Sequence, residues 1–154
     1  MNLLVGANYL YERKWGNAHN HFSLLLNNAP QDSIDSTLSI LNHLSLKGAQ
    51  LSYKSPALAG LFSSIIPGMG KIYSGRINDG LYSFFVIGLT AWQAYDGFNR
   101  DGNNSIKGWI YGTLGATFYL GNIYGSIVSV KLYNKKLEDN LINQIHVNLM
   151  WKLE

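Results

Sequence analysis

A glycine-rich segment followed by a lysine, Gly68-Met69-Gly70-Lys71, is the first stretch whose residue types could do chemistry. In phosphate-binding loops the backbone N–H groups hold the phosphates, and the lysine reaches the terminal ones. That motif also needs a glycine five residues before its second glycine and a Ser or Thr after the lysine. Ile65 and Ile72 occupy those positions. We therefore interpret the glycines as a turn.

Other side chains offer few sites for catalysis or metal binding. His19 and His21 are two residues apart in a helical pattern, so they point to nearly opposite sides and cannot share one ion. The chain has no cysteine, which excludes thiolate chemistry and disulfides. We predict no enzyme activity, no cofactor and no metal site. A membrane enzyme that acts on lipids near Asp79 or Asp96 is the alternative.

Charge is scarce and unevenly distributed along the chain. Charged residues make up 14% of the sequence, against about 25% in typical soluble domains. Residues 55–70, 80–95 and 108–130 contain no Asp, Glu, Lys or Arg. The net charge is only +3 and the basic residues are scattered, so nucleic acid is not an expected partner.

The elements that would position these residues are predicted to be helices of a transmembrane domain. The predicted segments are 55–73, 78–98 and 106–131. A spanning helix needs about 20 apolar residues. The uncharged run Gly108 to Val130 has 23 residues and is the clearest candidate. Ser55 to Gly70 has only 16 and contains Pro67, so this run either crosses the bilayer or enters it and returns.

Aromatic and basic residues indicate how this domain would lie in the membrane. Trp92 and Trp109 flank the polar loop 99–107, as an interfacial aromatic belt does. The basic residues of the opposite end are Lys71, Arg76, Lys131, Lys135 and Lys136. The positive-inside rule places that end in the cytoplasm, which predicts a bacterial inner-membrane protein in contact with lipids. Residues 1–54 are then periplasmic if 55–70 crosses the bilayer and cytoplasmic if it returns.

A glycine and aromatic motif joins the first two predicted segments. Its residues, with a later aspartate, are Pro67, Gly68, Gly70, Tyr73, Gly75, Gly80 and Asp96. This pattern resembles the two-transmembrane-helix (TM-two) domain family and its bacterial relatives, in which the motif ends the first helix and forms a tight turn. Lys71-Ile72 stands where that family has a His-Phe pair, and this chain adds a third segment. The resemblance implies an integral membrane protein without an established catalytic activity.

Small residues recur, mostly four apart, along the third predicted segment. They are Gly108, Gly112, Ala116, Gly121, Gly125 and Ser129. Small side chains let helix backbones approach closely, which drives helix association in lipid, and Thr117 and Asn122 could add hydrogen bonds between helices. The pattern predicts either a homo-oligomer formed through this face or packing against the chain's own first two segments.

The first 54 residues have the periodicity of amphipathic helices. This stretch resembles a tetratricopeptide repeat, and the positions that carry the resemblance are Gly6, Tyr9, Ala18, Phe22 and Pro30. Trp15-Gly16-Asn17 is predicted to be the turn between its two helices. Residues 33–46 predict a further helix, with Ser33 as its N-cap and Leu38 and Leu41 on its apolar face.

A single repeat cannot bury a continuous core, because about three units are needed. Residues 1–54 are therefore expected to pack against N-terminal sequence before Met1, against the membrane surface or against a protein partner. A partner would make this a protein-binding module; the alternative is a plain helical hairpin that packs only on its neighbours.

The last segment, 133–154, is predicted to be a polar tail behind a basic stop-transfer flank. Within it, Ile145 to Leu153 alternates apolar and polar residues with period two, which predicts a short strand.

Taken together, the sequence predicts an all-α protein with a short helical module in front of two or three transmembrane helices. The predicted function is that of a non-enzymatic scaffold or accessory subunit of an envelope complex. An oligomeric transport or channel component is the alternative.

Overall fold

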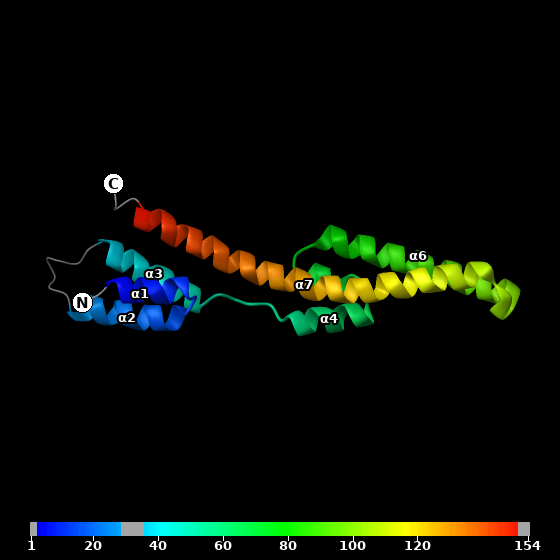
Figure 1. Ribbon diagram of the computed structural model, residues 1–154, viewed down its shortest axis with the longest axis horizontal. Coiled ribbons are helices and arrows are strands. Elements are labelled where there is room, and N and C mark those ends of the chain that lie inside the picture. The colour runs from blue at the N-terminus through cyan, green and yellow to red at the C-terminus, as the bar shows by residue number, and fades with distance from the viewer. Residues whose placement is uncertain (1–2, 29–35, 151–154) are drawn as a thin grey trace. The chain divides into compact units, whose positions relative to one another are not determined.

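The computed structural model describes residues 3–28 and 36–150, and every regular element among them is a helix. In chain order these are α1 (Leu3–Tyr11), α2 (Trp15–Asn28), α3 (Ser36–Ala49), α4 (Pro56–Ile65), α5 (Met69–Tyr73), α6 (Ile77–Asp101), the short 3₁₀ helix η2 (Gly102–Asn104) and α7 (Ile106–Met150). The predicted all-α fold class is therefore confirmed. Figure 1 shows this order by colour.

The chain divides into two compact units. Unit 1 comprises Met1–Tyr53 together with Lys135–Glu154, and unit 2 comprises Lys54–Asn134. The helix α7 contributes its first part to unit 2 and its last part to unit 1.

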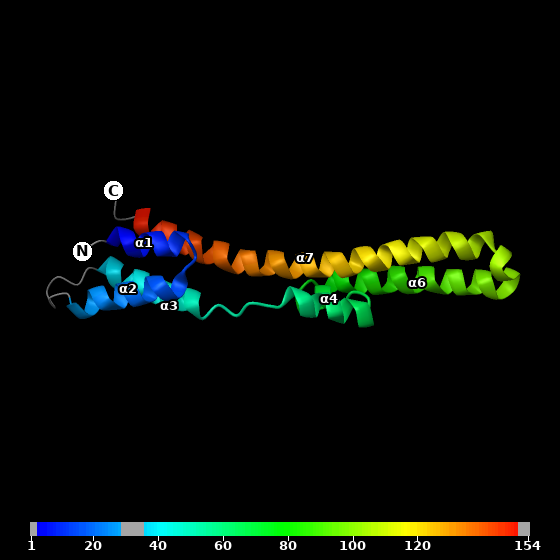
Figure 2. The same cartoon turned by 60° about the horizontal axis from the view of Figure 1, so that its bottom comes forward.

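Unit 1 is built around a core of large apolar side chains. Its buried members are Leu10, Trp15, Ala18, Phe22, Leu38, Leu41, Leu44, Leu141 and Ile145. The helices α1, α2 and α3 lie side by side in Figures 1 and 2. Gly6 faces the Phe22 ring so closely that a Cβ atom would clash with it, which explains why two of the repeat-like positions are small and aromatic. Pro30 and Ser33 lie outside the described residues.

The last part of α7 completes this core. Leu141 and Ile145 are 2% and 0% exposed within the cluster. Outside the core, Arg13 forms ion pairs with Glu138 and Asp139. Residues 1–54 therefore pack on the C-terminal part of their own chain, which was not among the supports expected from the sequence.

Two local predictions for unit 1 are wrong. The turn between α1 and α2 lies at Glu12–Lys14, where Arg13 has a φ of +58°, because Trp15 is needed inside the core and already begins α2. The predicted strand does not form either, since α7 continues to Met150. Its apolar residues Leu137, Leu141 and Ile145 repeat at helical spacing, which outweighs the period-two alternation that follows. Residues 151–153 lie outside the described residues.

Unit 2 is a bundle around the first part of α7. Figures 1 and 2 both show α6 running back along α7 and α4 lying along α7 as well. The contacts agree: Gly97 of α6 meets Gly108, and Ser64 of α4 accepts a hydrogen bond through its carbonyl from Tyr119 at 2.6 Å. The predicted segments 78–98 and 106–131 thus lie within helices.

The first predicted transmembrane segment is not a single helix. The helix α4 has 10 residues, about 15 Å of rise, and Ser55 caps it by accepting from the Leu58 N–H. The chain then turns through Pro67 and Gly68 into α5. The rise of α4 is about half the thickness of a bilayer core, which is about 30 Å.

The membrane-spanning helices predicted for unit 2 are not supported by the structure. No helix among the described residues combines the length and the apolar character that crossing a bilayer requires.

Candidate functional site

The glycine motif forms the turn that brings α4, α5 and α6 together. Gly68 has a φ of +88°, a left-handed conformation that favours glycine. It lies directly against the backbone of Gly80, and a Cβ atom on Gly68 would clash with the Gly80 carbonyl. Gly75 also has a positive φ, +91°, but faces open space. The structure therefore gives these motif glycines turn and close-contact roles.

Gly70 lies where α5 meets both α4 and α7. A Cβ atom there would clash with the Ala59 carbonyl and lie 2.7 Å from the Ser126 Cβ. The Gly70 N–H donates to Ser63 Oγ at 2.9 Å, and Ser63 and Ser126 share a hydrogen bond at 2.7 Å. A second hydroxyl pair, Ser74 and Ser129, is 2.6 Å apart.

Tyr73 fixes the start of α4. Its ring packs edge-on against Phe62 with centroids 5.5 Å apart, and its hydroxyl accepts from the Ser55 N–H at 3.3 Å. Lys54 donates to the Tyr73 carbonyl at 2.8 Å and lies over the Tyr133 ring. These contacts again indicate a structural role for the motif.

Asp96 lies at the other end of α6. Its carboxylate accepts from Arg100 at 2.9 Å and from Lys107 at 2.7 Å, so it joins α6 to the start of α7. Asp79 pairs with Arg76 at 2.6 Å in the first turn of α6. Each aspartate is thus held by basic neighbours at a helix end, and the two are not brought together into one site.

The helix-packing residues of α7 divide into two groups. Gly108 meets Phe98 of α6, and Ser129 bonds Ser74; Gly112 and Gly125 also face the chain's own side chains. Ala116 and Gly121 are exposed. Four of the six residues therefore contact other parts of the same chain.

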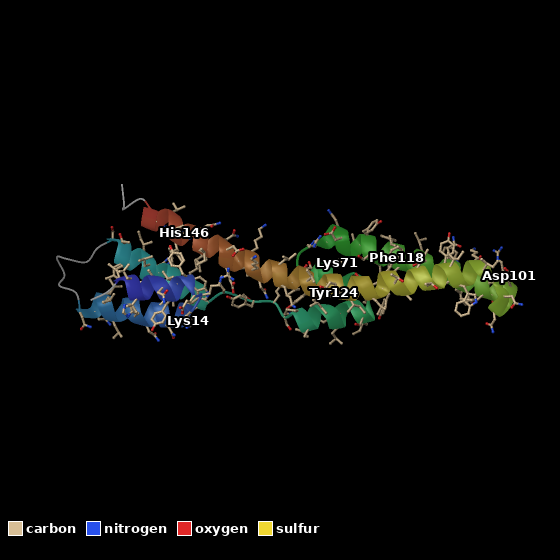
Figure 3. All side chains as sticks on the ribbon, viewed as in Figure 1. Lys14, Lys71, Asp101, Phe118, Tyr124 and His146 are labelled. Atoms are coloured by element: carbon tan, nitrogen blue, oxygen red, sulfur yellow. The ribbon has the colours of Figure 1, made fainter. Side chains whose placement is uncertain are left out.

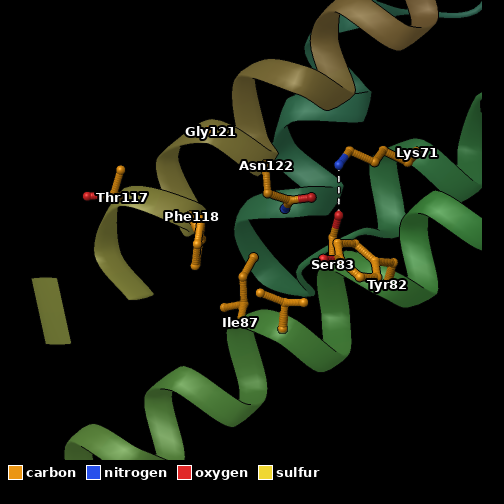
Figure 4. Close-up of a pocket in the computed structure, with 9 residues that line it drawn as sticks. Lys71, Tyr82, Ser83, Ile87, Thr117, Phe118, Gly121 and Asn122 are labelled. Carbon is orange, nitrogen blue, oxygen red and sulfur yellow. Dashed lines mark hydrogen bonds between the residues drawn. The ribbon is translucent and has the colours of Figure 1, made fainter. Parts of the chain in front are cut away.

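A cavity of about 430 Å³ lies between α5, α6 and α7. Its polar side chains are those of Lys71, Ser83, Asn122, Tyr82 and Thr117, and Val86, Ile87 and Phe118 form apolar walls. Lys71 Nζ donates to Ser83 Oγ at 2.7 Å, as the dashed line in Figure 4 shows. A pocket of this size, mostly apolar with a few convergent polar groups, is typical of small-molecule sites.

Asn122 is the unusual residue of this cavity. Its side chain is 4% exposed, yet neither its amide nitrogen nor its amide oxygen has a hydrogen-bond partner. In Figure 4 its amide points toward the Lys71–Ser83 pair. Buried amides almost always have partners, so the unsatisfied pair of atoms marks a place where a polar ligand or a water fits.

Comparisons with family models, with curated proteins and with solved structures find no match. The function must therefore be argued from the residues themselves.

Sequence reasoning named three residues that line this cavity, Lys71, Thr117 and Asn122, but not their arrangement. Lys71 was considered in a phosphate loop, which was rejected, and at the basic end of the domain, and Thr117 and Asn122 were expected to form hydrogen bonds between helices. Thr117 instead donates to the Thr113 carbonyl within α7, and Asn122 makes no side-chain bond. The one feature of the sequence that could have indicated this cavity is an asparagine, Asn122, within an uncharged apolar run. No cluster of His, Asp or Glu suited to a metal occurs in the described part of the chain.

Proposed function

We propose that unit 2 is a membrane anchor and that unit 1 is a helical protein-binding module, so that the chain acts as a non-enzymatic scaffold or accessory subunit of an envelope complex. The observation that carries this proposal is the distribution of side chains in unit 2, which is opposite to that of unit 1.

The buried residues of unit 2 are mostly small or polar. They include Ser63, Ser74, Ser83, Ser105, Asn122, Ser126 and Ser129, beside the apolar Ala59, Ile87, Ala94 and Val130. In water, such an interior would give little hydrophobic stabilisation. In lipid, small residues and hydroxyl pairs are the usual contacts between helices. Unit 1, by contrast, buries Leu, Phe and Trp side chains.

The outward side of unit 2 is strongly apolar. Its exposed large side chains include Leu61, Ile65, Phe85, Leu89, Trp92, Ile110, Leu120 and Tyr124, each more than half exposed. Phe118 and Tyr124 are marked on α7 in Figure 3. Monomeric soluble proteins rarely expose extended apolar surface, and acyl chains would cover these side chains.

The same distribution explains why no stretch of α6 or α7 is uniformly apolar. The buried polar residues Ser83, Asn122, Ser126 and Ser129 lower the mean hydropathy of α6 and α7, although many large outward side chains are apolar. A packed helical hairpin meets lipid only with its outward side. The helix α6 has 25 residues, about 37 Å of rise, which exceeds the bilayer core of about 30 Å.

The way unit 1 is assembled from both ends of the chain favours two crossings of the membrane by unit 2. Its core contains residues from α1–α3 and from the end of α7, so both ends of unit 2 must emerge on the same side of a membrane. The helices α6 and α7 would cross, and α4 and α5 would enter and return. The basic residues at that side support a cytoplasmic location for unit 1.

The exposed apolar residues of unit 1 support a protein-binding role. Leu4 on α1 is 78% exposed and Leu24 on α2 is 57% exposed. Such residues are candidate contacts for a partner.

Extraction of membranes with alkaline carbonate tests the anchor. The full chain should stay in the membrane pellet, because its apolar outward side chains hold it in lipid. Release into the supernatant together with a peripheral control protein would refute the proposal.

A further inference from the structure

The cavity of unit 2 combines one cation with one unpaired amide. A lysine ammonium has three donors, and Ser83 Oγ takes one of those of Lys71. No carboxylate of the described residues lies within ion-pair distance of Lys71. Asn122 adds amide N–H donors and one carbonyl acceptor, all unpaired. Lys71 and Asn122 together therefore present several donors beside one acceptor.

The donors and the acceptor of Lys71 and Asn122 indicate which polar groups a ligand would need. An anionic oxygen would accept from the Lys71 ammonium and from the Asn122 amide N–H. The Asn122 carbonyl oxygen would still need a donor, which a hydroxyl group on the same ligand can supply. A phosphate group with a nearby hydroxyl meets both requirements.

The apolar residues that line the cavity fit an apolar part of the same ligand. Val86, Ile87 and Phe118 line the cavity, and Phe118 is 45% exposed, so it also reaches the outward side of α7. A ligand with its polar group at Asn122 could extend an acyl chain along these residues into the surrounding lipid. A volume of about 430 Å³ holds a headgroup and the start of one chain but not a whole phospholipid.

We propose that the cavity between α5, α6 and α7 binds the headgroup of an anionic phospholipid that carries a free hydroxyl, with its phosphate at Lys71 and Asn122 and its hydroxyl on the Asn122 carbonyl. The inference rests on the proposed membrane location only for the source of the lipid; the site itself follows from the cavity.

Binding of defined lipids to the full chain in a neutral detergent, followed by native mass spectrometry, tests this assignment. The probes are phosphatidylglycerol, phosphatidylcholine and soluble glycerol 1-phosphate. We expect phosphatidylglycerol to bind at least tenfold more tightly than phosphatidylcholine, which has no free hydroxyl and no net charge. Equal binding of the two lipids would overturn the proposal. Equal binding of glycerol 1-phosphate would show a site for a free anion and overturn the lipid assignment.

Two variants locate the site. Asn122→Leu removes both unpaired atoms at similar volume and should weaken phosphatidylglycerol binding at least fivefold while keeping the helical circular-dichroism spectrum. Lys71→Met should weaken it at least tenfold. Lys131→Met removes an exposed charge from α7 outside the cavity and should change binding less than twofold.

Unchanged binding by Asn122→Leu would mean that its amide holds only water, and would overturn the proposal. Equal losses in Lys71→Met and Lys131→Met would indicate general attraction to basic residues and would also overturn it. Carbonate release combined with specific phosphatidylglycerol binding would refute the anchor and leave this site intact.

Discussion

Gly68 and Gly75 have almost the same backbone conformation but very different surroundings. Both have φ near +90°, while only Gly68 lies against another backbone, that of Gly80. A left-handed φ costs a non-glycine residue about 1–2 kcal/mol, and a clash with backbone adds overpacking strain. Substitutions at the two positions therefore distinguish the cost of a left-handed backbone from the cost of a clash with a neighbouring backbone.

We expect Gly68→Ala to lower the free energy of unfolding by roughly 2–5 kcal/mol, since strain and overpacking add. Gly75→Ala should lower it by about 1–2 kcal/mol, from strain alone. The measurement is unfolding of the detergent-solubilised protein by dodecyl sulfate, followed by far-ultraviolet circular dichroism. Equal losses in the two variants would show that the contact between Gly68 and Gly80 is not formed.

Single residues also mark the limit of what the sequence could predict. The turn at Pro67–Gly68 was predictable, because Pro and Gly are strong turn residues. The cavity at Asn122 was not, since its members Lys71, Ser83 and Asn122 come from three helices whose register depends on packing. Nothing in the sequence predicts that the Asn122 amide lacks a hydrogen-bond partner.

Among the elements, α6 and α7 pack through their backbones at one end. A Cβ atom on Gly97 would lie 2.6 Å from the Gly108 nitrogen, and the Ser105 hydroxyl, which accepts from the Gly108 N–H, is close by. Gly88 lies on the same helix with no atom within 4 Å of its Cβ position. The two glycines are a matched pair on one helix.

Gly97→Ala should lower the free energy of unfolding by roughly 1–3 kcal/mol, because a backbone cannot move aside as a side chain can. Gly88→Ala should raise it by up to about 1 kcal/mol, since alanine favours the helix over glycine. Thermal unfolding in detergent compares the two variants. If Gly97→Ala were as stable as Gly88→Ala, the packing of α6 on α7 would be different from that described here.

The end of α7 is the element that sequence reasoning assigned wrongly. Leu137, Leu141 and Ile145 have helical spacing, whereas the alternation after Ile145 predicted a strand. The helices α2, α3 and α6 were easier, since long periodic or apolar runs specify them locally. The packing of the end of α7 into the core of unit 1 could not be predicted from local sequence. Leu141 lies far along the chain from the residues of α1–α3 that it contacts.

Ile145→Ala should destabilise unit 1 by about 2–5 kcal/mol, because it empties part of a fully buried position. Val147→Ala, at a side chain that is 56% exposed, should change stability by less than about 0.5 kcal/mol. Hydrogen exchange of the α2 and α3 amides measures the effect. Equal protection of these amides in both variants would contradict the packing of α7 on unit 1.

For the whole molecule, the two units have opposite relations between interior and surface. Unit 1 buries large apolar residues, as a domain in water does. Unit 2 buries mainly small and hydroxyl side chains and exposes large apolar ones. The proposal of two crossings rests on two observations: the break after Ile65, which Pro67 and Gly68 made predictable, and the packing of Leu141 and Ile145 in the core of unit 1, which only the structure reveals.

The central claim is that unit 2 is a two-crossing hairpin with unit 1 in the cytoplasm. Because the chain has no cysteine, the single substitutions His43→Cys in α3 and Asn103→Cys in η2 give labels without background, and both positions are exposed. With a membrane-impermeant maleimide on intact cells, Asn103→Cys should react at once and His43→Cys only after permeabilisation. Reaction of both positions from the same side would contradict the account.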